Sequence, residues 1–333
     1  NNMEVSGIAF DISRKSGTVS GIRLQGKANK LHNCSFLSGG GVSIQTYLSE
    51  NAQIYSNVFT GKSESGVQVS GSNPGLKIYN NLFESCERGV SLYNAADGNV
   101  IASNTFIAST VYDIGYYNAT PKDNVIQNNI ITKGLGELNN KKNDELMSNF
   151  LSQNTFSNNL FHVADGSVVI AIDEANNTFT FDQAAELPSF QNNFVDDPGY
   201  AGESDFSLSD DSPAIDAGLA IDFITTDILG NPRDGLPDIG AYENQNAVSD
   251  FTYVSATNPE AKQPLEEGII TTFTKPVDIA SLEGKVVLKP VSGGDAVEVS
   301  CQTVGNSVLV TPLSNLSAGT AYQLTIAAGT AAA

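Results

Sequence analysis

The chain has 333 residues, which is enough for two domains, and no run of 18 apolar residues predicts a membrane-spanning helix. Its formal net charge is −20, and the excess of acid lies between residues 143 and 243, where 19 acidic residues face 1 basic residue. A nucleic-acid partner needs clustered basic side chains, so the composition excludes that class of partner.

A six-residue motif, I-x-x-N-x-F, recurs along the first two thirds of the chain. Three copies are complete and three are relaxed: 54–59, 78–83 and 101–106, then 31–36, 126–131 and 156–161. Measured on the last apolar residue, the steps between repeats run from 23 to 34 residues. Such a period indicates a solenoid. Because the repeat is already running at Val5, we expect that a signal segment and an N-terminal cap are missing from this sequence.

A second repeated segment lies between successive copies of the motif. In this segment a glycine precedes strictly alternating apolar and polar residues. It occurs at 20–26, 40–46, 65–71 and 88–94. Two short strands per repeat cannot bury their apolar faces alone, so the copies must stack in parallel. The sequence therefore predicts an all-β fold, a right-handed parallel β-helix whose Phe and Ile columns face inward. The asparagine of each motif is interpreted as a structural ladder rather than a functional site.

Three outward columns are candidate carbohydrate surfaces. The alignment predicts the first two as Arg23, Ser43, Gln68, Ser91, Gly115 and as Gln25, Gln45, Ser70, Tyr93, Tyr117. On the opposite face it predicts His32, Tyr55, Tyr79, Ala102 and Gln127. Aromatic rings stack on sugar faces, so we predict carbohydrate contacts at Tyr93, Tyr117, Gln68, Tyr55 and Tyr79. The alternative is that these columns are ordinary solvated faces.

Two insertions lengthen the late repeats, near 133–153 and at 162–189. The second contains two alternating runs around a polar turn, which predicts a hairpin. This hairpin could be a lid or contact arm, or equally a plain loop.

The repeat period, the asparagine column and the paired strands resemble the pectate-lyase-like right-handed β-helix superfamily over residues 1–243. The segments 212–218, 229–234 and 237–243 resemble the closing segment of bacterial secreted or surface β-helix proteins. We interpret them as the structural C-terminal cap of the solenoid. The charged residues in this region could instead form a catalytic cluster: Asp216, Arg233, Asp238 and Glu243.

The composition changes near Asp250 to alternating Val, Thr and Ser without the motif. Residues 250–333 resemble the bacterial Ig-like domain of surface-layer and cell-wall proteins, a small β-sandwich that usually acts as a spacer. The last strand of that family is missing, so we expect the domain to be truncated.

The resemblance implies polysaccharide lyase activity as one expectation for this protein. Such a lyase needs a Lys or Arg base, and a cation or an Arg that neutralises the carboxylate of a uronate. The candidate catalytic residues are Lys62, Arg88 and Arg23, with Glu84 as a cation ligand. A calcium site could also use Asp196 and Asp197, or the nearby Asp210 and Asp211, although no calcium-loop spacing is present. The alternative is that these basic side chains are simply solvated and have no catalytic role. Glycoside hydrolysis would need clustered Asp carboxylates, which are absent from the outward columns.

The sequence therefore predicts an extracellular or cell-surface bacterial protein that binds or acts on polysaccharide. If it is an enzyme, we expect a lyase that acts on an acidic glycan, with calcium as the candidate cofactor. The alternative is a non-catalytic adhesin or structural surface protein, and the sequence does not indicate an oligomeric state.

Overall fold

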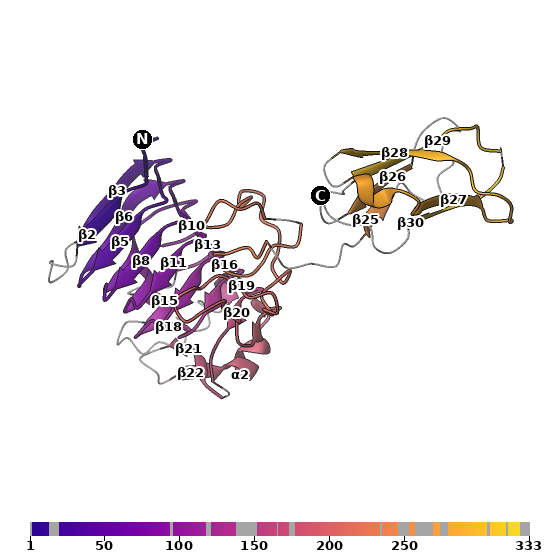
Figure 1. The fold of residues 1–333 in the computed structure, drawn as a ribbon. Helices are drawn as coiled ribbons and strands as arrows, with labels where there is room; N and C mark the ends of the chain where they lie inside the picture. The colour runs from indigo at the N-terminus through magenta and orange to yellow at the C-terminus, as the bar shows by residue number, and fades with distance from the viewer. Residues whose placement is uncertain are drawn as a thin grey trace. The chain divides into compact units, whose positions relative to one another are not determined.

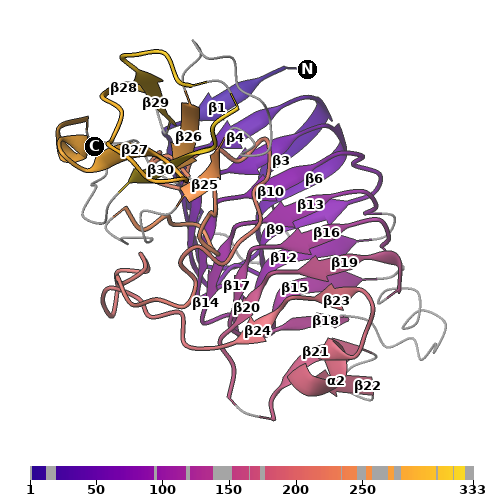
Figure 2. The same ribbon diagram turned by 90° about the vertical axis from the view of Figure 1, so that its right-hand side faces the viewer.

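The computed structural model describes residues 2–12, 20–93, 96–117, 121–137, 152–164, 166–172, 177–233, 235–245, 253–256, 269–273, 279–304, 307–317 and 319–326. The chain forms two compact units, Asn1–Ala247 and Val248–Ala333. In the first unit, strands of successive coils lie side by side in three sheets (Figures 1 and 2). This is the predicted β-helix.

Sheets A and B contain eight parallel strands each. Sheet A is formed by β1 (Glu4–Ser6), β4 (Lys30–His32), β7 (Gln53–Tyr55), β10 (Lys77–Tyr79), β13 (Val100–Ala102), β16 (Val125–Gln127), β19 (Thr155–Ser157) and β23 (Phe190–Gln191). Sheet B is formed by β2 (Ala9–Ile12), β5 (Ser35–Ser38), β8 (Val58–Gly61), β11 (Leu82–Glu84), β14 (Thr105–Ile107), β17 (Ile130–Ile131), β20 (Leu160–Phe161) and β24 (Phe194–Val195).

Sheet C contains the longer strands. It is formed by β3 (Ser20–Lys27), β6 (Val42–Glu50), β9 (Ser65–Ser70), β12 (Arg88–Tyr93), β15 (Tyr112–Tyr117), β18 (Leu135–Glu137), β21 (Val168–Ile172) and the antiparallel β22 (Asn177–Thr180). Each coil therefore has three strands, and the expectation of two was wrong. The reason is that the I-x-x-N-x-F motif bends in its middle, where residues such as Asn80 adopt a left-handed φ of 52°.

The asparagine ladder is confirmed and lies at this bend, between sheets A and B. In Asn81, the backbone N–H and the side-chain Nδ2 both donate to Oδ1 of Asn104, each at 3.0 Å. Asn104 makes the same two bonds to Asn129. The remaining amide hydrogens reach backbone carbonyls of their own and the preceding coil. These side chains are buried, and their hydrogen bonds satisfy both the amides and the corner backbone.

A second ladder was missed by the sequence analysis. Asn99, Asn124 and Asn154 repeat the pattern at the corner between sheets C and A. The preceding coils carry Ala52 and Leu76 at this position, so the column does not look like a repeat in the sequence.

The predicted phenylalanine column is also confirmed inside the solenoid. Phe10, Phe36, Phe59, Phe83 and Phe106 stack with ring centroids 4.6 to 5.0 Å apart. Four of the five rings are at most 1% exposed, and Phe10 in the first coil is partly buried. They form one continuous core with the inward Ile, Leu and Val residues of all three sheets.

The second insertion closes the last coils of the solenoid. Its hairpin is confirmed, because β21 pairs antiparallel with β22. The short helix α2 (Phe181–Ala185), which was not predicted, follows directly and buries Ala184 in the core. Phe181 packs edge-on against Phe161 and Phe190. The hairpin thus extends sheet C and covers the core end, and it is not a projecting arm. Most of the first insertion lies outside the described residues.

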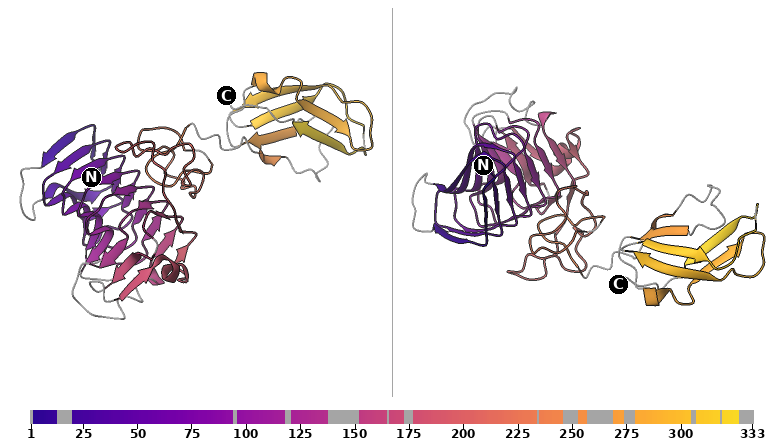
Figure 3. Two further views of the ribbon diagram at one scale, coloured as in Figure 1. Left: turned by 60° about the horizontal axis from the view of Figure 1, so that its bottom comes forward. Right: turned by 90° about the horizontal axis from the view of Figure 1, so that it is seen from above.

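Residues 196–233 and 235–245, here called the strap, fold back along the outside of the solenoid (Figure 3). Leu208, Ala214 and Ile239 pack on Ile130 and Leu160, which face outward from sheet B. Further along, Ile224 and Phe223 cover Tyr79 and Ala102 on sheet A.

The strap is hydrogen-bonded to the left-handed asparagines of the A–B bend. Asn128 pairs with both backbone groups of Leu219, Asn80 donates to Thr226 O, and Asn158 donates to Ala217 O. These closing segments therefore lie along the side of the solenoid, over sheets A and B.

The second unit is antiparallel. Its four-stranded sheet has the order β25 (Tyr253–Ala256), β26 (Ile269–Phe273), β29 (Ser307–Pro312) and β28 (Val299–Val304). A pair is formed by β27 (Val286–Pro290) and β30 (Tyr322–Ile326), and η1 (Ile279–Leu282) precedes β27. Leu282, Val308 and Val310 form its core. In neither unit do the described residues form a helix of the length and hydropathy that a bilayer crossing needs.

The ladder generates a stability prediction. Asn104→Leu should lower the free energy of unfolding of the solenoid by about 3 kcal/mol or more, because several buried polar groups lose their partners. Gln127→Ala, on the partly exposed outer side of β16, is the control and should change it by less than about 0.5 kcal/mol. Urea unfolding followed by circular dichroism measures both, and equal midpoints would contradict a stabilising ladder.

Candidate functional site

Sheet C carries exposed side chains on its outer face, whereas the strap covers the later strands of sheet B and part of sheet A. Arg23 and Tyr47 are exposed on this face, and the side chains of Gln45, Gln68 and Tyr93 are partly exposed. The candidate site is therefore built from the outward residues of β3, β6, β9, β12 and β15.

The register of sheet C differs from the predicted columns in one strand. Arg23 pairs with Gln45, which pairs with Gln68, Ser91 and Gly115 in turn. The neighbouring column is Tyr47, Ser70, Tyr93 and Tyr117. The predicted assignments of Ser43 and Gln45 were wrong by two residues. An even slip keeps every apolar side chain inward, so alternation alone did not reveal it.

Arg88 begins β12 and lies at one side of this face. Its Nη1 donates to Glu64 O at 3.3 Å and lies 3.7 Å from the Glu87 carboxylate. The side chain is 18% exposed, and within the described part of the chain its buried Nε has no partner. Only the exposed fraction of this side chain, and not its buried Nε, is within reach of a ligand on the surface.

Tyr93 and Tyr117 lie at the other end of the same strands. Their ring centroids are 4.8 Å apart with planes inclined by 39°. Burial raises the pKa of Tyr93, Glu64 adds to this effect and the positive charge of Arg88 opposes it.

The aromatic stack on sheet A is mostly covered. His32, Tyr55 and Tyr79 are stacked with centroids 4.5 and 4.8 Å apart, as the column predicted. Tyr79 is only 7% exposed, because Phe223 of the strap packs edge-on against it. Its hydroxyl donates to Gln53 Oε1. Of the two predicted sugar-contacting tyrosines on this sheet, only Tyr55 keeps accessible surface.

The three basic residues predicted as a catalytic group are not brought together. Arg23 shares a column with Ser91 of β12, three strands away, which corresponds to about 14 Å. Its guanidinium lies over the Tyr47 ring, 4.7 Å from the centroid. Lys62 is exposed and follows β8 at the corner between sheets B and C. Of the three, only Arg88 lies on the same strand as Tyr93.

The predicted cation ligands are also separated. Glu84 faces outward from β11, whereas Asp196 follows β24, four strands away and about 19 Å along sheet B. Asp196 Oδ1 accepts the N–H of Asp197, and Asp197 Oδ1 accepts that of Gly199. No group of three or more His, Cys, Asp or Glu side chains suited to a metal occurs among the described residues. Calcium binding therefore stays a prediction from the sequence.

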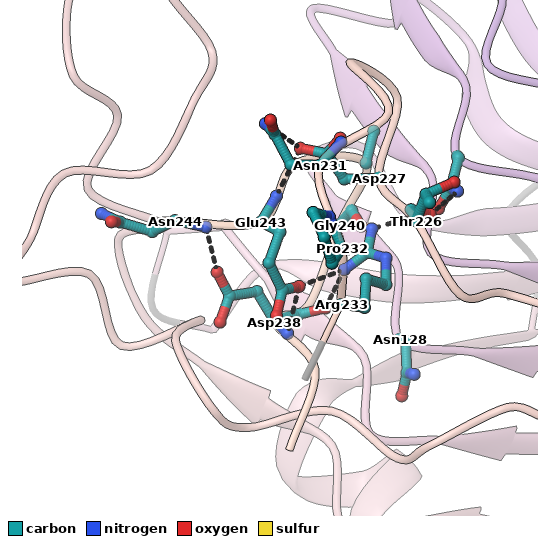
Figure 4. Close-up of polar contacts among 12 residues, drawn as sticks. Asn128, Thr226, Asp227, Asn231, Pro232, Arg233, Asp238, Gly240, Glu243 and Asn244 are labelled. Carbon is teal, nitrogen blue, oxygen red and sulfur yellow. Dashed lines mark hydrogen bonds and ion pairs between the residues drawn. The ribbon is translucent and has the colours of Figure 1, made fainter. Parts of the chain in front are cut away.

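The charged cluster of the strap is buried and surrounds Arg233 (Figure 4). Arg233 Nη1 donates to Glu243 Oε2 at 2.7 Å and to Asp238 O at 3.0 Å. Its Nη2 donates to Gly240 O and to Asn80 Oδ1 of the solenoid. The side chains of Arg233 and Glu243 are 2% and 4% exposed. This arrangement supports the structural interpretation. The ion pair holds the strap against the solenoid, and its buried side chains are not accessible to a substrate.

The acidic residues of the cluster are similarly engaged. Asp227 accepts from the backbone of Leu229, Asn231 and Glu243. Asp238 accepts the N–H groups of Asp216 and Asn244. Burial nevertheless raises the pKa of Asp238 to about 6 from an ordinary 3.8, against the lowering effect of these hydrogen bonds and of Arg233.

Tyr47 is the site residue that the sequence analysis missed. It would have been found if the second coil had been aligned two residues further along, since Tyr47 then joins the column of Tyr93 and Tyr117. A β-bulge at Tyr47 and Leu48, with Leu48 at a φ of 51°, shifts the register between β3 and β6, so the repeat pattern of the sequence did not indicate this alignment.

Comparison with known proteins supports the two-part organisation. Residues 20–184 match the family model described as a right-handed beta helix region. Residues 249–333 match the bacterial Ig-like domain. The chain is thus a right-handed β-helix region followed by a bacterial Ig-like domain. A search of the curated proteins found no match.

Asp238 gives the solenoid unit a pH-dependent contribution to stability. Because its pKa is raised in the folded protein, this contribution is fully present below pH 3.8 and is lost as the pH rises through about 6. The loss corresponds to roughly 3 kcal/mol at most. We expect the melting temperature of the wild type minus that of Asp238→Asn to fall from pH 4 to pH 7, because only the wild type has to ionise the buried carboxyl. A signed difference that stays constant or rises over this range would contradict the assignment.

Proposed function

We propose that this protein binds a uronic-acid-containing polysaccharide, outside the cell or at the bacterial surface, across the outer face of sheet C. The observation that carries the proposal is the partly exposed Arg88 side chain on β12, the strand that also carries Tyr93, whose ring packs against Tyr117.

The chemistry of these groups fits an acidic glycan. A guanidinium presents paired N–H donors that match a carboxylate, and tyrosine rings give apolar surface for the C–H groups of a sugar. Residues 1–142 carry 12 basic and 10 acidic residues, so an anionic chain is not repelled by this part of the solenoid. Gln68 adds a partly exposed amide on the same face, whereas the Ser91 hydroxyl is buried and hydrogen-bonded to Ser65 Oγ.

Binding without cleavage is the form of this function that the geometry supports best. β-Elimination needs a base and a charge-neutralising group within reach of one sugar. Arg23 lies about 14 Å along the sheet from the strand of Arg88, and Lys62 lies at another corner. A bacterial Ig-like domain is typical of surface-associated proteins, which agrees with an adhesive role.

Arg88→Ala should weaken retention of the protein by polyuronate gels by at least tenfold, because the carboxylate loses its charged donor. Affinity electrophoresis through gels that contain different uronic-acid polysaccharides measures the retention. The control is Lys122→Ala, which removes the same charge from an exposed position at another corner.

Cleavage is tested separately by mixing the protein with the same polysaccharides in solution and measuring the ultraviolet absorbance of an unsaturated uronate product. Retention that is equal in the wild type and Arg88→Ala would contradict the proposed site. A rise in absorbance that persists in Arg88→Ala would mean cleavage elsewhere on the molecule.

A further inference from the structure

Arg23 is a basic residue on the outer face of sheet C that the proposed function leaves unused. Its side chain is exposed, and its guanidinium lies over the ring of Tyr47, 4.7 Å from the centroid. Within the part of the chain that the structure describes, no hydrogen bond or ion pair joins this guanidinium to another residue. Its N–H donors are therefore available to a ligand.

The positive charge of Arg23 has no carboxylate beside it in its column. The residues at this register position on β6 and β9 are Gln45 and Gln68, both neutral. The one carboxylate of β6, that of Glu50, is already paired with Lys27. An anionic group that reaches Arg23 thus meets a charge that the neighbouring strands do not neutralise.

Tyr47 holds the guanidinium in place. Its ring contacts the following coil at Gly71, where a β-carbon would meet the ring Cε2 at 3.5 Å. A guanidinium that stacks on an aromatic face keeps its N–H donors, which lie in its own plane, free for hydrogen bonds. A side chain that is positioned before the ligand arrives also loses less conformational entropy on binding.

Two amides continue from Arg23 along the column. Gln45 Oε1 accepts a hydrogen bond from Ser20 Oγ at 3.3 Å, and Gln68 Nε2 donates one to Ser70 Oγ at 2.9 Å. Both side chains are partly exposed. A guanidinium binds a carboxylate through paired N–H donors, and amides bind hydroxyls, so this row has the chemistry to bind an acidic sugar and its neighbour.

The register of sheet C gives the separation of Arg23 from Arg88. The column of Arg23 reaches β12 at Ser91, three strand spacings of about 4.8 Å away. Arg88 precedes Ser91 by three residues, which adds about 10 Å along the strand. The α-carbons of the two arginines are therefore about 17 Å apart, diagonally across the sheet. A single sugar cannot contact both side chains, whereas an oligosaccharide can.

We propose that Arg23, positioned by Tyr47, binds a second carboxylate of the same polyuronate chain that Arg88 binds. This inference rests on the proposed function and adds the length of glycan that the protein recognises. Once one carboxylate is bound, the second contact forms within the complex, at a high effective concentration. The protein therefore selects uronate chains that are long enough to bridge the two arginines over short oligosaccharides.

The test measures affinity against chain length. The probes are oligomers of galacturonic acid and of glucuronic acid with two, four, six or eight sugars, and titration calorimetry gives the affinities. For the wild type, affinity should rise at least tenfold once the oligomer bridges the arginines. Arg23→Ala should lose this rise and bind the longest oligomer at least tenfold more weakly. Lys122→Ala, which removes the same charge from an exposed position elsewhere, should keep the rise.

A matched pair of variants tests the role of Tyr47. Tyr47→Phe keeps the ring beneath the guanidinium and should bind the longest oligomer as the wild type does. Tyr47→Leu removes the ring but keeps an apolar side chain beside Gly71, and it should bind that oligomer at least threefold more weakly. Thermal melting of both variants shows that they are folded.

Equal affinity of the wild type and Arg23→Ala for the longest oligomer, together with weaker binding by Arg88→Ala, would overturn this inference and leave the proposed function standing. An affinity that does not depend on chain length, or equal binding by Tyr47→Leu and Tyr47→Phe, would also overturn it. If the wild type binds none of the oligomers, the proposed function fails as well.

Discussion

The asparagine ladder at the A–B bend is the interaction on which the rest of the first unit depends. Each buried amide pairs with the next coil, as between Asn104 and Asn129, and it occupies the backbone groups of a sharp corner that would otherwise be unsatisfied. The corner in turn separates sheets A and B, and it fixes the phenylalanine stack one strand away. In a solenoid this geometry is copied from coil to coil, because each coil contacts mainly its neighbours.

Three of the residues that precede a ladder asparagine, Asn80, Asn128 and Asn158, link the corner to the strap. Asn80 and Asn128 have left-handed φ values of 52° and 55°, a conformation that asparagine tolerates better than most residues. Their amides therefore point away from the ladder and bind the strap, whose own ion pair between Arg233 and Glu243 is buried at the contact. The strap covers the later strands of sheet B and part of sheet A, whereas Arg23 and Tyr47 on sheet C stay exposed. The left-handed asparagines thus help to decide which parts of the solenoid surface are covered.

The sequence predicted what repeats and failed where repetition ends. The solenoid, the asparagine and phenylalanine columns and the Ig-like unit follow from patterns that recur or change abruptly. The slip at Gln45 and Tyr47 was invisible because an alternating strand looks the same after a shift of two residues. Helix α2 and the course of the strap occur once each, and their positions depend on long-range contacts such as Arg233 with Asn80. A basic cluster of Lys62, Arg23 and Arg88 was expected because their spacing in the sequence does not show how far apart their coils lie along the solenoid.

The account makes sheet C the ligand-binding face and the strap a structural element. The most direct measurement is a crystal structure of the protein with a bound oligosaccharide that contains glucuronic acid. We expect the sugar to lie over β9 and β12, with its carboxylate within hydrogen-bonding distance of Arg88. A sugar bound at the strap, on sheet A beside Tyr55 or on the Ig-like unit, with the face of sheet C empty, would contradict the account.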